Sequence, residues 1–335
     1  MSLKIYLTGD INLLNVSDSQ HPFQHLKKTL EPADLIFSNL ECCFFDTSRP
    51  GTISGREGFF VPTKLAEALF DGGISAVGIA NNLNYGPKAI RSSIETLEKL
   101  GIKHAGAGMN RKEAHRPIII EHNDLRIGFL QRSSIFWPAN HAALKDYPGI
   151  AILKAHTAYE PTLPHKPGSP PTVHTWADPA GLAEFKQEIS DLKKRCDLVI
   201  SSHHWGLKET VFDYQIEIAH AAIDAGADVV MGHGAHMPLP IEIYKEKPIF
   251  YGLAHLFFLM GHGGKRQTGD GLIAKLTVES KQITKVAFSM VETTDNDLSI
   301  PILEADLKIR LANFPTMKNT ELNQLEDDAL VQFIG

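Results

Sequence analysis

The alternation of short apolar runs with longer segments of helical periodicity most strongly constrains the fold of this chain. The runs "KIYLTG", "DLIFSNLE", "SAVGIA", "DLVISS" and "DVVMG" have the length and apolar character of buried β-strands. Between them, "GPKAIRSSIETLEKLG" repeats apolar residues at helical spacing, with Pro87 in its first turn and Gly101 at its end. This pattern predicts an α/β fold in which β-sheets are flanked by helices.

Three longer apolar segments predict β-hairpins, with turns near residues 123–124, 245–247 and 280–281. Antiparallel pairs therefore accompany the parallel crossovers, and the sheets are expected to be mixed. Helical periodicity predicts further helices in "PTKLAEALFDGG", "DPAGLAEFKQEISDLKKRC" and "DYQIEIAHAAIDAG".

The 335 residues are interpreted as one domain over residues 1–292, followed by a C-terminal extension, residues 293–335, that predicts one or two closing helices. One segment inside the domain, residues 133–178, is rich in proline and carries scattered aromatic residues with little periodicity. A loop of this length in a compact domain is usually functional. We therefore expect an insertion that forms a lid or a groove wall beside the functional site.

The composition excludes several classes of protein. A formal net charge of -6 argues against a nucleic-acid surface, which requires a basic face. No apolar run approaches the roughly 20 residues that cross a bilayer. The sequence opens on a strand without a signal-peptide pattern, so a cytoplasmic location is expected as the sequence stands, or a cell-envelope one if a signal or anchor has been removed. Cys42, Cys43 and Cys196 are expected to be buried reduced thiols.

Polar side chains follow five of the predicted strands, each at its carboxyl end, where α/β sheets bind ligands. These residues are Asp10, Glu41, Asn81, Asn82, His203, His204, His233 and His236. Carboxylates, carboxamides and imidazoles together suit Mn, Fe or Zn. Two such ions, bridged by a carboxylate, can position a hydroxide and a phosphate oxygen for in-line attack.

Each of these residues also has a purely structural interpretation. Asp10 can cap a turn, and Asn82 can satisfy backbone groups before Gly86. Glu41 sits among apolar neighbours, where an unpaired carboxylate is costly to bury, and this favours a metal as its partner. His203 and His204 point to opposite faces of a strand, so only one of them reaches the site easily.

The motifs "GDINLL", "SNLE", "IANN", "SHHWG", "DAGADVVMGHGAH" and "IEIYKEKPIFYGL" resemble, in order over about residues 3–260, those of the capsule and poly-gamma-glutamate biosynthesis (CapA-type) family. This family is a branch of the calcineurin-like metallophosphoesterases. The resemblance implies an α/β sandwich of two facing mixed sheets with helices outside. It also implies a divalent metal site, of one or two ions, at Asp10, Glu41, Asn82, His204 and His236.

The chain departs from the family pattern at several positions. Leu83 stands where the family has a histidine, which in the wider superfamily acts as general acid or electrostatic clamp, and Gly234 replaces one ligand. Asn84 stands in place of an aspartate, and an extra residue shifts Glu209 out of step. His255 stands where the family has asparagine, at the end of the predicted strand "IFYGLAH", and we hypothesise that it supplies the lost imidazole. His233 is expected either to replace the missing ligand or to support the site through a hydrogen bond. His255 and His233 are thus the candidate catalytic residues.

Three further residues are candidates for substrate binding. Asn81 lies at a strand end, and Lys265 and Arg266 lie in the glycine-rich "MGHGGKRQTGDG". Lys and Arg suit phosphate or carboxylate groups. The alternative for this segment is a solvated turn.

Three functions remain open from the sequence. The first is a metal-dependent hydrolase that attacks a phosphoester, or a related anionic ester or amide, through metal-bound hydroxide. The second is a non-catalytic protein that binds an anionic polymer or a partner in polymer synthesis or export, as the changes at Leu83 and Gly234 suggest. The third is a metal-free small-molecule binding module. The resemblance implies a role in capsule or poly-gamma-glutamate biology, and the oligomeric state stays open.

Overall fold

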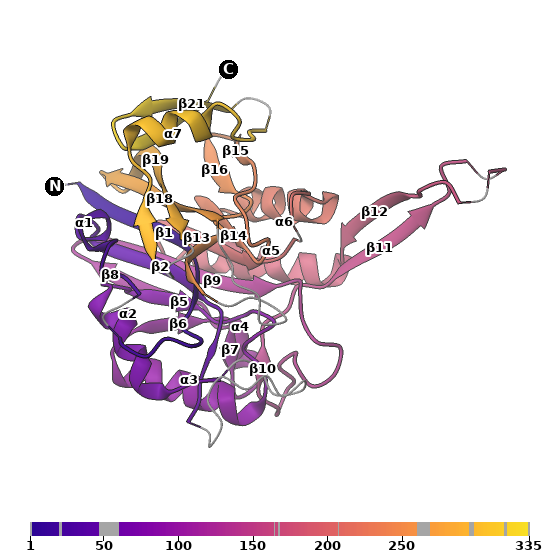
Figure 1. The fold of residues 1–335 in the computed structure, drawn as a ribbon. Helices are drawn as coiled ribbons and strands as arrows, with labels where there is room; N and C mark the ends of the chain where they lie inside the picture. Colours follow the sequence, from indigo (N-terminus) through magenta and orange to yellow (C-terminus); the bar gives the residue numbers. More distant parts are fainter. Residues whose placement is uncertain are drawn as a thin grey trace.

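Two large mixed β-sheets form the centre of the computed structural model, which describes residues 2–19, 22–46, 60–163, 165–166, 168–206, 208–259, 269–294, 298–317 and 320–333. One apolar cluster lies between the sheets and joins Ile5 and Phe37 of the first to Phe129 and Ile200 of the second. The expected sandwich of two facing mixed sheets with helices outside is confirmed (Figure 1).

The first sheet has the strand order β21-β22-β19-β18-β1-β2-β5-β6, with β17 beside β1 and β20 beside β19. Strands β1, β2, β5, β6 and β17 are parallel to their neighbours in this group, whereas β18 runs antiparallel to β1. The bounds are β1 (Leu3–Asn12), β2 (Leu35–Leu40), β5 (Ala76–Gly78), β6 (Lys103–Ala105), β17 (His255–Phe258), β18 (Gly269–Glu279), β19 (Gln282–Thr293), β20 (Ser299–Pro301), β21 (Thr320–Leu325) and β22 (Asp328–Phe333).

The second sheet has the order β15-β16-β14-β13-β9-β8, and three two-stranded pairs lie outside both sheets. Its strands are β8 (Ile118–His122), β9 (Leu125–Ser133), β13 (Leu198–His204), β14 (Val229–His233), β15 (Ile241–Tyr244) and β16 (Lys247–Phe250). The pairs are β3 (Cys43–Phe44) with β4 (Phe60–Val61), β7 (Ala107–Gly108) with β10 (Gly149–Ile150), and β11 (Ala155–Glu160) with β12 (Thr172–Ala177).

Helices cover the outer face of each sheet. Leu69 and Leu97 pack in one apolar cluster with Ile36 of the first sheet, and Phe185 and Ile218 share another with strands of the second. None of the described helices is long and apolar enough to cross a bilayer. The helices are α1 (Lys27–Leu30), the 3-10 helix η1 (Thr63–Ala66), α2 (Glu67–Asp71), α3 (Pro87–Lys99), α4 (Arg111–His115), α5 (Pro179–Lys193), α6 (Asp213–Asp224) and α7 (Glu304–Leu311).

The predicted hairpin turns are confirmed by their backbone conformation. Asn123 has φ 53°, Glu246 has φ 62°, and Lys281 has φ 67°, the left-handed conformation that tight hairpin turns require. The C-terminal segment was predicted only in part: it contains the expected helix α7, but β21 and β22 form a hairpin that pairs with β19.

The insertion expected at residues 133–178 has two parts. The first part contacts the loop after β5. The indole N–H of Trp137 donates to the carbonyl oxygen of Asn82 at 2.8 Å, and Nε2 of His141 lies 3.0 Å from the carbonyl oxygen of Asn84. The second part is the β11–β12 hairpin, which projects away from the rest of the molecule and exposes Tyr159 (Figure 1).

The chain crosses from the second sheet to the first between β16 and β17. Strand β17 then pairs with β1, with His255 opposite Asp10. His255 therefore begins a strand of the first sheet, and the prediction that it ends a strand was wrong because the backbone leaves the second sheet after Phe250. The crossing is very close: a Cβ on Gly9 would lie 2.3 Å from the carbonyl oxygen of Ala254.

We predict that Gly9→Ala destabilises the protein by about 3 kcal/mol, the upper end of the usual cost of overpacking, because its Cβ meets backbone that cannot rotate away. Urea unfolding measures the change. The matched control is Gly181→Ala in α5, where the added Cβ contacts a Leu153 side-chain carbon at 3.3 Å. Equal stability of Gly9→Ala and the control would contradict the close crossing.

Candidate metal centre

The strands deliver the predicted ligands to one place. Asp10 lies near the end of β1, Glu41 directly follows β2, and His204 ends β13. Asn82 lies in the turn after β5, and His236 lies in the loop after β14. These residues come from both sheets and meet at the carboxyl ends of parallel strands, which is the usual ligand position in α/β proteins.

Strand register adds two more histidines to this group. His233 is paired with His204 across β13 and β14, and His255 is paired with Asp10 across β1 and β17. Residues paired side by side project from the same face of a sheet, because side chains alternate along each strand. Both candidate catalytic histidines therefore point to the same side as a predicted ligand.

One group of possible ligand atoms comes from Asp10, Glu41 and His204, and these atoms lie within 4.8 Å of one another. Nε2 of His204 lies 4.0 Å from Oε1 of Glu41 and 2.8 Å from Oδ1 of Asn82. The group thus combines two carboxylates, one imidazole and a carboxamide oxygen.

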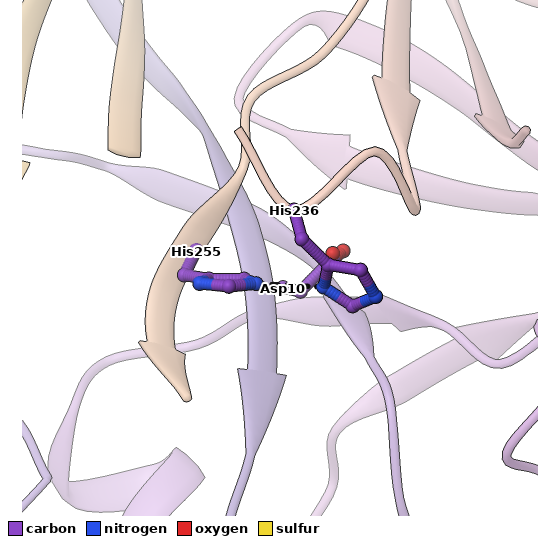
Figure 2. A group of neighbouring side chains, drawn as sticks. All are labelled: Asp10, His236 and His255. Atoms are coloured by element: carbon purple, nitrogen blue, oxygen red, sulfur yellow. Dashed lines mark hydrogen bonds between the residues drawn. The ribbon is translucent and has the colours of Figure 1, made fainter. Parts of the chain in front are cut away.

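A second group comes from Asp10, His236 and His255, again within 4.8 Å (Figure 2). Nδ1 of His236 lies 2.8 Å from Nε2 of His255, and its other nitrogen, Nε2, lies 4.0 Å from Oε1 of Glu41. The two groups share Asp10, and Glu41 lies between the imidazoles of His204 and His236.

The carboxylate of Glu41 shows that these residues suit a cation. Glu41 is fully buried, and among the described residues no donor forms a hydrogen bond with either of its oxygens. Burial raises the pKa of Glu41 well above its usual range, and the negative charge of Asp10 adds to this shift. A divalent ion would offset both the burial of the Glu41 carboxylate and its repulsion by Asp10, so the donor set fits Mn, Fe or Zn.

Asp10 has a different environment. Burial alone would raise its pKa, but His233, His204 and His236 together hold the pKa well below the usual range. Nδ1 of His233 lies 3.0 Å from Oδ1 of Asp10, so His233 contacts a predicted ligand. For His255, burial and the neighbouring His236 lower the pKa to about 3.

The family's other two positions are closed here. Gly234 has φ 91°, and a Cβ there would lie 3.0 Å from both Nε2 of His204 and the carbonyl oxygen of Trp205. Leu83 is buried, and its backbone N–H donates to Oδ1 of Asn81. Position 234 therefore cannot carry an imidazole without local rearrangement, and position 83 carries an apolar side chain instead.

The expected substrate contact of Asn81 is not supported by its surroundings. Its side chain is buried, with Nδ2 donating to Asn39 and Leu40 and Oδ1 accepting from Leu83 and Asn84. All four hydrogen-bonding positions are therefore used within the fold. The candidates Lys265 and Arg266 lie outside the described residues.

Three residues near the site were missed from the sequence. Nδ2 of Asn39 donates to Oδ1 of Asp10 at 2.8 Å, and Nε2 of Gln131 donates to Oδ1 of Asn39 at 2.9 Å. Trp137 holds the backbone of Asn82. Alternation along β2 was a usable signal for Asn39, which stands two positions before Glu41.

Known proteins resemble this chain over most of its length. The family model described as "Bacterial capsule synthesis protein PGA_cap" matches residues 4–258. "Uncharacterized protein y4sH" of Sinorhizobium fredii is 28% identical, over 72% of this chain and 63% of its own length. "Capsule biosynthesis protein CapA" of Bacillus anthracis is 24% identical, over 77% and 60% respectively.

A solved structure described as a novel phosphatase from Mycoplasma pneumoniae aligns with 87% of this chain and 94% of its own, with a TM-score of 0.48 and 14% identity. The chain spans about three fifths of the length of the two curated relatives above: the matched region is 63% of the first and 60% of the second.

We predict that Glu41→Gln unfolds at a higher temperature than the wild type in EDTA at neutral pH. A buried polar group without a partner costs roughly 1–3 kcal/mol, and an ionised one costs more, so the neutral carboxamide is cheaper to bury. With Mn²⁺ the wild type is expected to unfold at the higher temperature, because only the carboxylate gains a strong bond to the cation.

Differential scanning calorimetry with and without Mn²⁺ measures this change, and Glu121→Gln, at an exposed position of β8, is the control. A wild type that is more stable than Glu41→Gln in EDTA would mean that Glu41 already has a stabilising partner within the protein.

Proposed function

The chain belongs to the bacterial capsule synthesis protein PGA_cap family, and from this premise we propose that it is a metal-dependent hydrolase. The proposed substrate is a phosphoester, or a related anionic ester or amide. The observation that carries the proposal is the buried Glu41 carboxylate, which has no hydrogen-bond donor among the described residues and lies between two imidazoles.

Asp10, Glu41, Asn82, His204 and His236 would hold one or two divalent ions. A bound ion at this place supplies positive charge for a phosphoryl or acyl oxygen and lowers the pKa of water. The protein's own contribution is to bring these donors together and to bury them. His233 contacts Asp10 and stabilises its negative charge.

Exposure of the site residues indicates where a substrate would approach. Asp10, Glu41 and His204 are buried, whereas the side chain of His236 is 20% exposed and Asn82 is half-buried. Beside Asn82, Trp137 is 49% exposed. A substrate reaching the centre from this side would meet Asn82 and His236 first and would place an apolar portion against the indole of Trp137.

The substrate class follows from the family and the relatives rather than from the site alone. The relative from Bacillus anthracis is named for capsule biosynthesis. We therefore infer that the substrate is an anionic capsule-type polymer, or an intermediate in its synthesis.

A second candidate function is binding of such a polymer without turnover. The observations that favour it are the closed position 234 and the buried Leu83. Under this alternative the polymer or partner is bound, binding survives chelation, and no bond in the polymer is broken.

We predict that the protein hydrolyses a chromogenic phosphodiester when Mn²⁺ is added and that His204→Ala lowers the rate by more than about a hundredfold, beyond the effect usual for residues that only support a metal ligand. His174→Ala, on the exposed β11–β12 hairpin, is the matched control and is expected to keep full activity.

Elemental mass spectrometry on the same samples measures bound Mn. Wild type that holds Mn but shows no turnover would support the non-catalytic alternative. Wild type without bound ion after incubation with Mn²⁺ would contradict the hydrolase and leave the binding function standing.

A further inference from the structure

The two nitrogens of His236 face different groups. Nδ1 lies 2.8 Å from Nε2 of His255, whereas Nε2 faces Oε1 of Glu41 at 4.0 Å. Figure 2 shows the ring of His255 pointing toward His236, with Asp10 behind them. A neutral imidazole carries a single proton, so the hydrogen bond made by one nitrogen decides whether the other has a free lone pair.

The ring of His255 is held rigidly. It is 2% exposed and stacks on Phe258, with ring centroids 4.5 Å apart and an angle of 24°. Its backbone is in register with Asp10 and so close to β18 that a Cβ on Gly271 would lie 1.9 Å from the carbonyl oxygen of His255. The stack on Phe258 therefore holds the ring, and the neighbouring strands hold its backbone, which together fix the position of its Nε2.

His236 is held less firmly by its own backbone. It lies in the loop after β14, has φ 60° and is ten times more exposed than His255, at 20% against 2%. A ring on such a loop has several rotamers available unless another group selects one. The described groups that contact the ring in its observed rotamer include His255, through the nitrogen pair at 2.8 Å, and Phe258, with ring centroids 5.2 Å apart.

We propose that His255 is a positioning residue for a metal ligand: its Nε2 accepts the Nδ1–H of His236, so that the unprotonated Nε2 of His236 is the one that faces Glu41. Metal-binding histidines commonly donate their second ring N–H in this way, which fixes both tautomer and orientation. The cation itself rests on the proposed function.

Geometry distinguishes this role from direct ligation by His255. Two imidazole nitrogens bound to one tetrahedral ion at 2.0–2.1 Å are about 3.3 Å apart. The observed separation of 2.8 Å is that of a hydrogen bond. A substrate also has little access to a ring that is 2% exposed, so His255 acts through His236.

Nitrogen NMR of protein labelled with ¹⁵N-histidine tests the proposal directly, in the metal-free state and after addition of Zn²⁺. With Zn²⁺ we expect the signal of a coordinated nitrogen at His236 Nε2, a retained proton on His236 Nδ1, and an uncoordinated Nε2 on His255. A coordinated His255 Nε2, or a proton on His236 Nε2, would overturn the proposal.

Variants measured by isothermal titration calorimetry with Mn²⁺ give a second test. His255→Leu removes the acceptor and is expected to weaken binding about 10–100-fold, whereas His255→Gln retains an acceptor oxygen at a similar reach and should stay within about threefold of wild type. Equal affinity of all three proteins, or Gln as weak as Leu, would overturn the proposal.

The wild-type NMR experiment keeps the proposal testable if His255→Leu fails to fold. Neither measurement depends on turnover, so a protein without hydrolase activity can still confirm the role of His255, and an active hydrolase can contradict it.

Discussion

Two carboxylates buried between the sheets, Asp10 and Glu41, are the constraint on which the rest of this structure depends. Asp10 is balanced within the protein, because Asn39 donates to it and three histidines surround it. Glu41 lacks such a balance among the described residues. A carboxyl buried in this way either takes up a proton, as its raised pKa allows, or binds a cation. The neighbouring carboxylate and imidazole groups are compatible with a divalent ion.

The sheets are fixed to each other close to these carboxylates. Gln131 on β9 of the second sheet donates to Asn39 on β2 of the first, and its oxygen accepts from the N–H of Ala80 at 2.6 Å. A Cβ on Gly78 would lie 2.2 Å from Gln131, so the approach depends on glycine at that position. This buried polar contact sets the distance between the histidines of one sheet and the carboxylates of the other.

The departures from the family pattern have a common structural result. Positions 83 and 234 carry no imidazole, and the histidines at positions 233 and 255 lie on the side of Asp10: His233 contacts it, and His255 is its partner in β-sheet register. The imidazoles therefore cluster around Asp10 and His236.

Local patterns in the sequence determined the central strands, their hairpin turns and the longer helices, because periodicity and turn chemistry depend on neighbouring residues. The β11–β12 and β21–β22 hairpins were not predicted. They also placed Asp10, Glu41, Asn82 and the histidines at strand ends, where one edge of a sheet brings them together. The sequence could not reveal that the side chain of Asn81 uses all its hydrogen-bonding positions within the fold. Nor could it reveal that the chain changes sheets before His255, or that His255 contacts His236. Those features depend on contacts between segments far apart in the chain, and only the packing of one sheet against the other decides them.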